Sequence, residues 1–151
     1  MAAGATGLVG REIVAALLAE KTVNAVHCVG RRALAERHPK LRSHVVDFAA
    51  LPALPRVDEC YIALGTTLKV AGSHTTFKAI DLDAVVAVAW AAKAAGATKF
   101  GVVSAIGAKL ESCVVDNQIK GEMELTLTSM GLDSLVIARP SLPDGDRSAL
   151  G

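Results

Sequence analysis

Three glycines near the start of the chain are spaced in a way that could form a ligand-binding loop. They stand in the segment Gly4-Ala5-Thr6-Gly7-Leu8-Val9-Gly10, directly before a helical pattern. Glycines let a backbone turn tightly and approach a ligand, and free amides at a helix N-terminus bind phosphate. The segment therefore predicts a loop that binds a diphosphate, with a plain glycine-rich turn as the alternative.

Two arginines, Arg31 and Arg32, follow Gly30 at the end of the next apolar run. About 20 residues after such glycines, dinucleotide folds place an acid for the ribose of NAD, or an arginine near the 2′-phosphate of NADP. No acid stands here, and two guanidinium groups suit a phosphate dianion. We therefore expect NADP(H) in preference to NAD(H), and a solvated basic pair is the alternative.

The next apolar run ends in Asp47 and Phe48. We expect the Asp47 carboxylate to accept a hydrogen bond from the adenine amino group, with the Phe48 ring beside the adenine. An aspartate that ends a strand inside a turn is the alternative.

These residues depend on elements that alternate along the chain. Apolar residues at helical spacing predict helices over residues 8–20, 75–95 and 117–130. Gly96 and Gly131 are well placed to end the second and third helices. Short apolar runs predict strands over residues 25–29, 44–46, 61–64, 99–103 and 135–138.

Strands that are apolar throughout and separated by helices are typical of a parallel sheet covered on both faces. We expect one α/β domain over residues 1–151, a doubly wound, Rossmann-like, three-layer α/β/α fold that binds ligands at the carboxyl ends of its strands. Only Met1-Ala2-Ala3 precede the first glycine, where this fold has a strand of about 5–6 residues. We therefore expect the first strand to be truncated.

The composition excludes several classes of function. The 151 residues include 16 Lys+Arg and 15 Asp+Glu, a net charge of +1, which argues against a nucleic-acid binder. Aromatic residues make up 3% of the chain, too few for base-stacking platforms. The apolar run over residues 84–92 is about half of what a membrane span requires. We expect a cytoplasmic protein with no nucleic-acid or membrane partner.

The residues most suited to bind metals show no ligand spacing. The three cysteines form no C-x-x-C pair, and His27, His38, His44 and His74 are scattered along the chain. We therefore expect no metal site.

Several short motifs along the whole chain together resemble an atypical short-chain dehydrogenase/reductase, specifically the Tat-interacting-protein-like oxidoreductases and their bacterial relatives. The glycine segment alone is shared by a very large superfamily, and its combination with the other motifs is more specific. These motifs are Gly30-Arg31-Arg32, Leu64-Gly65-Thr66-Thr67, Ala71-Gly72-Ser73, Val103-Ser104-Ala105-Ile106-Gly107-Ala108, Lys120-Gly121-Glu122 and Ala138-Arg139-Pro140-Ser141.

The resemblance implies an NADP(H)-binding Rossmann fold. The diphosphate would lie over residues 6–9, the 2′-phosphate on Arg31 and Arg32, and the nicotinamide half near residues 64–67. Family chemistry uses a Ser that orients the substrate oxygen, a Tyr that transfers the proton, and a Lys that assists the Tyr and holds the nicotinamide ribose. On this chain the resemblance assigns the Ser to Ser104 and the Lys to Lys120. A hydroxyl that bonds backbone and an exposed helix lysine are the alternatives.

The family Tyr is missing from its place. Four residues before Lys120 stands Asp116, for which a helix N-cap is the alternative to a catalytic role. The one tyrosine, Tyr61, lies inside a predicted strand and is expected to be a core residue with a partnered hydroxyl. Relatives also continue past the point where this chain stops, and Pro143-Asp144 stand where relatives are apolar. We therefore expect the C-terminal substrate segment to be truncated.

Two functions follow from these expectations. The first is an NADP(H)-binding oxidoreductase that transfers a hydride to or from an unknown carbonyl or alcohol. The second is a non-catalytic module that binds or senses NADP(H) and acts through a protein partner. A homodimer through the helix over residues 75–95 and the helix that carries Lys120 is expected from the related proteins.

Overall fold

The centre of the protein is a parallel sheet of six strands in the order β3-β2-β1-β4-β5-β6. The structure, a computed structural model, describes residues 1–141. All five pairings between neighbouring strands are parallel, as the apolar runs predicted. The strands are β1 (Ala2–Ala3), β2 (Val26–Gly30), β3 (Leu41–Val45), β4 (Glu59–Ile62), β5 (Lys99–Val103) and β6 (Ser134–Ala138).

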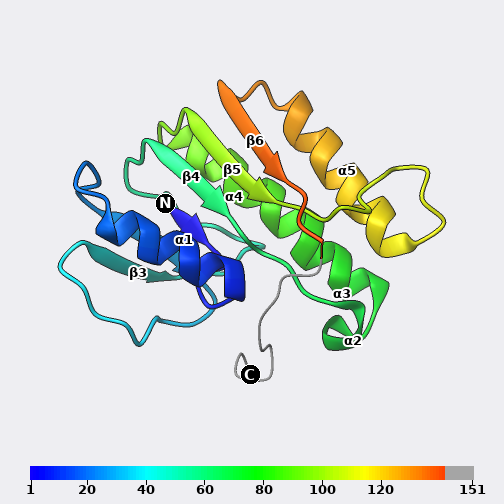
Figure 1. The fold of residues 1–151 in the computed structure, drawn as a ribbon, viewed down its shortest axis with the longest axis horizontal. Helices are drawn as coiled ribbons and strands as arrows, with labels where there is room; N and C mark the ends of the chain where they lie inside the picture. Colours follow the sequence, from blue (N-terminus) through cyan, green and yellow to red (C-terminus); the bar gives the residue numbers. More distant parts are fainter. Residues whose placement is uncertain (142–151) are drawn as a thin grey trace.

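Helices cover both faces of this sheet. Helix α1 lies on one face, and α4 and α5 lie on the other (Figure 1). This arrangement confirms the predicted doubly wound α/β fold. The helical elements are α1 (Leu8–Ala19), α2 (Leu68–Ala71), α3 (His74–Lys78), the π-helix η1 (Ala79–Asp83), α4 (Ala84–Ala94) and α5 (Val115–Ser129).

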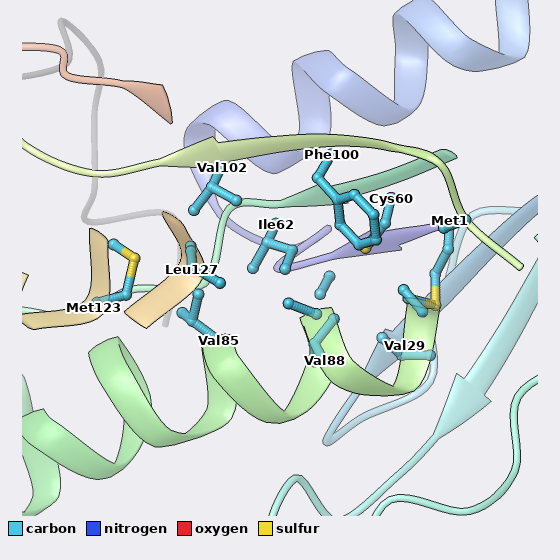
Figure 2. Packing of buried hydrophobic residues seen from close by; sticks show 14 of the residues in the cluster. Met1, Val29, Cys60, Ile62, Val85, Val88, Phe100, Val102, Met123 and Leu127 are labelled. Carbon is cyan, nitrogen blue, oxygen red and sulfur yellow. The ribbon is translucent and has the colours of Figure 1, made fainter. Parts of the chain in front are cut away.

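Small aliphatic residues build the larger of two cores, between the sheet and α4 and α5. Figure 2 shows Ile62, Phe100 and Val102 on the sheet facing Val85 and Val88 on α4. The smaller core joins α1 to the sheet through Val14, Leu18, Val26 and Cys28. The two cores together hold the central strands, from whose carboxyl ends the loops of the site begin.

Strand β1 has two residues and lies in the middle of the sheet, between β2 and β4. Ala2 pairs with Cys28 of β2 and with Tyr61 of β4, and Ala3 is 1% exposed. These two residues thus form the central strand of the sheet, and the glycine segment follows directly after it. The predicted C-terminal departures at Pro143 and Asp144 lie outside the described residues.

Three predicted elements were wrong in detail. The strand predicted over 61–64 is β4 (Glu59–Ile62), which begins and ends two residues earlier. The strand predicted over 44–46 is β3 (Leu41–Val45), because its bounds follow its pairing with β2, and its outer residues Arg42 and Ser43 are exposed and polar. The single helix predicted over 75–95 is divided into α3, η1 and α4 by a turn with one extra residue. Gly96 and Gly131 do adopt positive φ, at 101° and 64°.

Candidate functional site

The segments singled out in the sequence all follow strands at the carboxyl edge of the sheet. The glycine segment follows β1, the arginine pair follows β2, and residues 64–67 follow β4. Ser104 follows β5 directly. In this topology the strand order reverses between β1 and β4, which is where open α/β sheets bind their ligands. The fold therefore brings the predicted loops to one crevice.

The glycine segment packs too tightly for side chains at two of its positions. Gly4 has φ of 87°, and a Cβ there would lie 2.3 Å from the Ala63 carbonyl oxygen of the segment after β4. A Cβ on Gly10 would lie 1.9 Å from the Gly4 carbonyl oxygen. The loop is thus pressed against the strand end and against its own helix, which only glycine permits.

The N-terminus of α1 is free of side-chain caps. Gly7 is the N-cap, and no side chain accepts from the first turn, which also contains no acid. The Gly7 amide donates to the Gly4 carbonyl at 3.0 Å, which closes the turn before the helix. The first amides of α1 can therefore donate hydrogen bonds to an anion, which the positive end of the helix dipole would also stabilise.

The two arginines are exposed beside this loop. Among residues 1–141, neither Arg31 nor Arg32 makes a side-chain hydrogen bond or an ion pair. The structure therefore leaves both guanidinium groups available to a ligand, and it also suits a solvated basic pair.

Asp47 is partly used by the protein itself. Its Oδ1 accepts from the Ala49 amide at 2.9 Å, the turn that the sequence offered as the alternative. Phe48 is half-buried and packs against the larger core. The second carboxylate oxygen of Asp47 accepts no hydrogen bond from residues 1–141.

Asp81 is a site residue that the sequence analysis missed. It lies in η1, is 1% exposed, and accepts from the Lys120 ammonium at 2.6 Å. Its other oxygen accepts from the Thr66 amide at 3.0 Å. Burial raises the pKa of Asp81, against which Lys120 and the Thr66 amide act in the opposite direction. One carboxylate therefore joins the loop after β4 to the helix that carries Lys120.

A signal for Asp81 was present in the sequence. It lies four residues after Phe77 and three before Ala84, on the apolar stripe of the predicted helix. An acid on a buried stripe requires a partner, and here the partner is Lys120. Asp81 also lies in a π-helical turn that interrupts the predicted helix. Such turns are frequent at functional sites, so the interruption also indicates a functional site here.

The loop after β4 ends in a short helix. Thr67 is the N-cap of α2, and its Oγ1 accepts from the Val70 amide at 3.3 Å. Leu64 packs against the larger core, and a Cβ on Gly65 would lie 3.4 Å from Asp81 Oδ1. Residues 64–67 are thus positioned by the core at one end and by Asp81 and α2 at the other.

Asp116 is not the N-cap of its helix, so the alternative offered from the sequence was wrong. Val114 is the N-cap, and Asp116 lies in the first turn of α5. Its Oδ1 is buried with no hydrogen-bond partner among the described residues, and it lies 3.8 Å from His74 Nδ1. His74 was expected to be one of the scattered histidines, but the fold brings it to this site.

Ser104 also holds an unused polar atom. The residue is 5% exposed, and its Oγ has no partner within hydrogen-bond geometry among residues 1–141. It is close enough to the Glu124 carboxylate to lower the pKa of that group slightly. The alternative offered for Ser104, a hydroxyl bonded to backbone, is therefore wrong.

Glu124 of α5 pairs with Arg139, which follows β6. Arg139 Nε donates to the two carboxylate oxygens at 3.0 and 3.2 Å, and Nη2 donates to Oε2. Burial acts to raise the pKa of Glu124, but Arg139, with Ser104 and Lys120, lowers it below its usual 4.5. The pair fixes the end of β6 to the helix that carries Lys120 and Asp116.

Tyr61 and Lys120 do not form the pair in which a Lys assists a catalytic Tyr, because each bonds to another residue. The Tyr61 hydroxyl donates to Glu59 at 2.7 Å, and this bond raises the pKa of Tyr61 to about 12. The hydroxyl of Tyr61 is therefore partnered, as predicted, but the residue is only half-buried and does not belong to either core, so that part of the prediction was wrong. Lys120 is 15% exposed and lies 5.9 Å from the centre of the Phe77 ring, so it is not the exposed helix lysine of the alternative.

Among residues 1–141 there is no group of three or more His, Cys, Asp or Glu that could hold a metal. His27 and His44 do lie together, with Nδ1 and Nε2 2.9 Å apart, which corrects the expectation that they are scattered. No helix in the same range is long and apolar enough to cross a bilayer.

Comparison with known protein sequences gives a consistent result. A model of the NAD(P)H-binding family matches residues 4–149. The chain is 33% identical over 151 residues to Protein HTATIP2 of Rattus norvegicus, with 95% of this chain and 62% of that protein covered. It is also 33% identical over 155 residues to Protein fmp52-1, mitochondrial, of Aspergillus terreus, covering 95% and 66%. The chain thus spans less than two thirds of the length of these relatives.

Solved structures share the fold. The oxidoreductase ylbE from Lactococcus lactis matches with a TM-score of 0.72 at 20% identity, covering 93% of this chain and 68% of that chain. The UDP-glucuronic acid 4-epimerase of Bacillus cereus in complex with NAD matches with a TM-score of 0.70 at 15% identity, covering 93% and 54%. At these identities the likeness establishes the Rossmann-like fold.

Proposed function

The chain belongs to the NAD(P)H-binding family, in the atypical short-chain dehydrogenase/reductase group with HTATIP2 and the FMP52 proteins, and on that premise we propose that it is an NADP(H)-dependent oxidoreductase. The observation that carries the proposal is the glycine loop at the start of α1. Side chains are excluded from Gly4 and Gly10, and no side chain caps the helix. This is the cradle that a dinucleotide diphosphate requires.

The adenosine half is assigned to the ends of β2 and β3. Arg31 and Arg32 are exposed beside the loop and would bind the 2′-phosphate that distinguishes NADP(H) from NAD(H). Asp47 would accept from the adenine amino group through the oxygen that its turn leaves free. Phe48 would contact the adenine with the exposed part of its ring.

The nicotinamide half is assigned to residues 64–67 and the start of α5. Ser104 Oγ and Asp116 Oδ1 are the buried polar atoms that lack partners among the described residues, which fits a site completed by a ligand. When bound, the nicotinamide supplies or accepts a hydride. Ser104 Oγ would hydrogen-bond the oxygen of a carbonyl or alcohol substrate, and Lys120 would contact the ribose. Asp116 would hold or release the proton at Oδ1, in place of the family Tyr.

A titration of the purified protein tests cofactor binding. We expect NADPH to bind about tenfold more tightly than NADH in isothermal titration calorimetry. We also expect it to raise the unfolding temperature by a similar increment for each tenfold increase in ligand concentration above the dissociation constant. Absence of binding by both cofactors would reject the proposal. Equal affinities would retain a dinucleotide site and reject the 2′-phosphate assignment.

A second candidate function is a non-catalytic NADP(H)-binding module that acts through a protein partner. The observation that favours it is Asp116, which stands in the first turn of α5 where the family has its Tyr. Turnover of NADPH with a panel of aldehydes and ketones, abolished by Lys120→Ala, would support the enzyme. NADPH binding without turnover, with activity only after Asp116→Tyr, would support the module.

We also propose that the protein forms a homodimer through α4 and α5. Trp90 on α4 and Leu125 on α5 are 51% and 53% exposed, and a groove between the two helices is lined by Val86, Trp90 and Thr126. Light scattering should give twice the 15.6 kDa chain mass, and Trp90→Glu should return it to the monomer. A monomeric wild-type protein would reject this interface.

We propose a cytoplasmic protein whose partners are the cofactor and a small-molecule substrate. The names of the fungal relatives place those proteins in mitochondria. Fractionation of cells that express the tagged chain decides between the two compartments.

A further inference from the structure

We infer that Asp116 makes this site prefer the oxidised cofactor, NADP⁺, over the reduced one, because two carboxylates here face a single ammonium. The inference rests on the proposed function, which puts the nicotinamide end of the cofactor beside residues 104, 116 and 120. It adds a role for the residue that stands where the family Tyr is missing.

The charge of Lys120 is already used by the protein. Its ammonium lies 2.6 Å from Asp81 Oδ1, and the Asp81 side chain is 0% exposed. The Thr66 amide donates to the other carboxylate oxygen at 3.0 Å. A buried carboxylate with an ammonium and an amide as donors remains charged and neutralises the ammonium.

Asp116 is therefore an additional negative charge. It lies in the first turn of α5, one helical turn before Lys120. Its carboxylate is close enough to the carboxylate of Asp81 for the two negative charges to repel each other. Asp116 Oδ1 is buried and has no hydrogen-bond partner among residues 1–141. The nearest basic nitrogen is His74 Nδ1 at 3.8 Å, on an imidazole that is 56% exposed.

Two neighbouring pairs of opposite charges offset each other. Lys78 of α3 pairs with Glu122 of α5 at 3.5 Å, and Arg139 after β6 pairs with Glu124. The formal charges of the Asp81 and Asp116 carboxylates and the Lys120 ammonium sum to one negative charge.

A second buried polar atom lacks a partner among residues 1–141, next to Glu124 of α5, the helix that carries Asp116 and Lys120. Ser104, at the end of β5, is 5% exposed, and its Oγ lacks a partner within the described part of the chain. A hydroxyl buried without a bond is costly unless a ligand or water satisfies it.

The oxidised and reduced cofactors differ in charge only at the nicotinamide. The oxidised ring carries one positive charge and the reduced ring none, while the phosphates are the same. Arg31, Arg32 and the α1 amides therefore contribute equally to both, and the ratio of the two affinities isolates the nicotinamide end. A negative charge in a partly buried site stabilises the cationic ring selectively.

The test measures dissociation constants for NADP⁺ and NADPH by calorimetry at about pH 8.5, where imidazoles are neutral. We expect wild type to bind NADP⁺ more tightly, and Asp116→Asn to lower the ratio Kd(NADPH)/Kd(NADP⁺) on the order of fivefold. Asp116→Ser removes the same charge with a smaller side chain and should act alike. Glu122→Gln is the matched control, because it removes an exposed acid from the same helix and should leave the ratio unchanged.

The outcomes separate the inference from the proposed function. If neither cofactor binds wild type, the proposed function is rejected, and the inference with it. If both bind and the ratio is the same in wild type, Asp116→Asn and Asp116→Ser, the cofactor site is retained and the inference is overturned. An equal fall of the ratio in Glu122→Gln would likewise overturn it, because the effect would then be one of overall charge.

Discussion

Gly10 lies against Gly4 so closely that a methyl group on Gly10 would come within 1.9 Å of the Gly4 carbonyl oxygen. The first turn of α1 is thereby pressed onto the loop that precedes it. Gly7, between them, has more room, since a Cβ there would lie 3.4 Å from the same oxygen.

Replacement of Gly10 should therefore disrupt both the fold and the site. Gly10→Ala forces the backbone of the loop away from the helix, and we expect a loss of unfolding free energy of about 2 kcal/mol or more. Gly7→Ala is the control, because its extended φ of −77° and ψ of 168° suit an alanine. Urea denaturation of both variants checks this, and equal stability of the two would show that the close approach is relieved at no cost.

Removal of the arginine pair should change the selectivity between cofactors. In the double variant Arg31→Ala, Arg32→Ala, we expect NADPH affinity to fall roughly thirtyfold and NADH affinity less than threefold, because only NADPH carries the 2′-phosphate. Arg37→Ala removes an exposed charge from the same segment and serves as the control. Titrations at low and high salt should show the larger loss at low salt. Similar losses for NADPH and NADH would exclude a 2′-phosphate site at these residues.

The ion pair between Asp81 and Lys120 should be costly to break from one side. Lys120→Met leaves the Asp81 side chain, which is 0% exposed, without its cation, and we expect a loss of about 3–5 kcal/mol. The double variant Asp81→Asn, Lys120→Met has no buried charge and should recover part of that loss. Guanidinium denaturation of the four proteins in the cycle measures the coupling. Additive losses from the two single variants would contradict the pairing.

Acid should weaken the contact of Glu124 with Arg139. The pKa of Glu124 is lowered in the folded protein, so the group releases its proton more readily there than in the unfolded chain, whose pKa is near 4.5. Its stabilising contribution is present in full above pH 4.5 and disappears as the pH falls through the folded-state value. Wild type should therefore unfold at a higher temperature than Glu124→Gln at pH 7, and the difference should shrink below about pH 4. A difference that stays constant over this range would contradict the assignment.

The sequence predicted most accurately the elements whose pattern of apolar residues is visible within a short segment of the chain. The strand Lys99–Val103 has the bounds that were predicted, and the first helix differs by one residue. Strand β3 was displaced because its position is set by pairing with β2, from Val26–Leu41 onward, and a single sequence does not display a partner.

The site was predictable only where local geometry defines it. The glycine segment was identified because its function depends on backbone shape, which glycine positions reveal. Asp81 was missed because its role arises from Lys120, 39 positions further on. His74 was set aside for the same reason, since the fold alone brings it 3.8 Å from Asp116.

The π-turn over Ala79–Asp83 has a consequence for how this protein can evolve. Deletion of one residue there would merge α3 and α4 into a continuous α-helix, which forms better backbone hydrogen bonds. It would also rotate everything on one side of the deletion by about 100° around the helix axis relative to the other. Phe77 and Val88 face one core, so the rotation would separate them and turn Asp81 away from Lys120. Such a deletion would favour the helix itself at the expense of the site, so that selection on the site would be required to keep the extra residue.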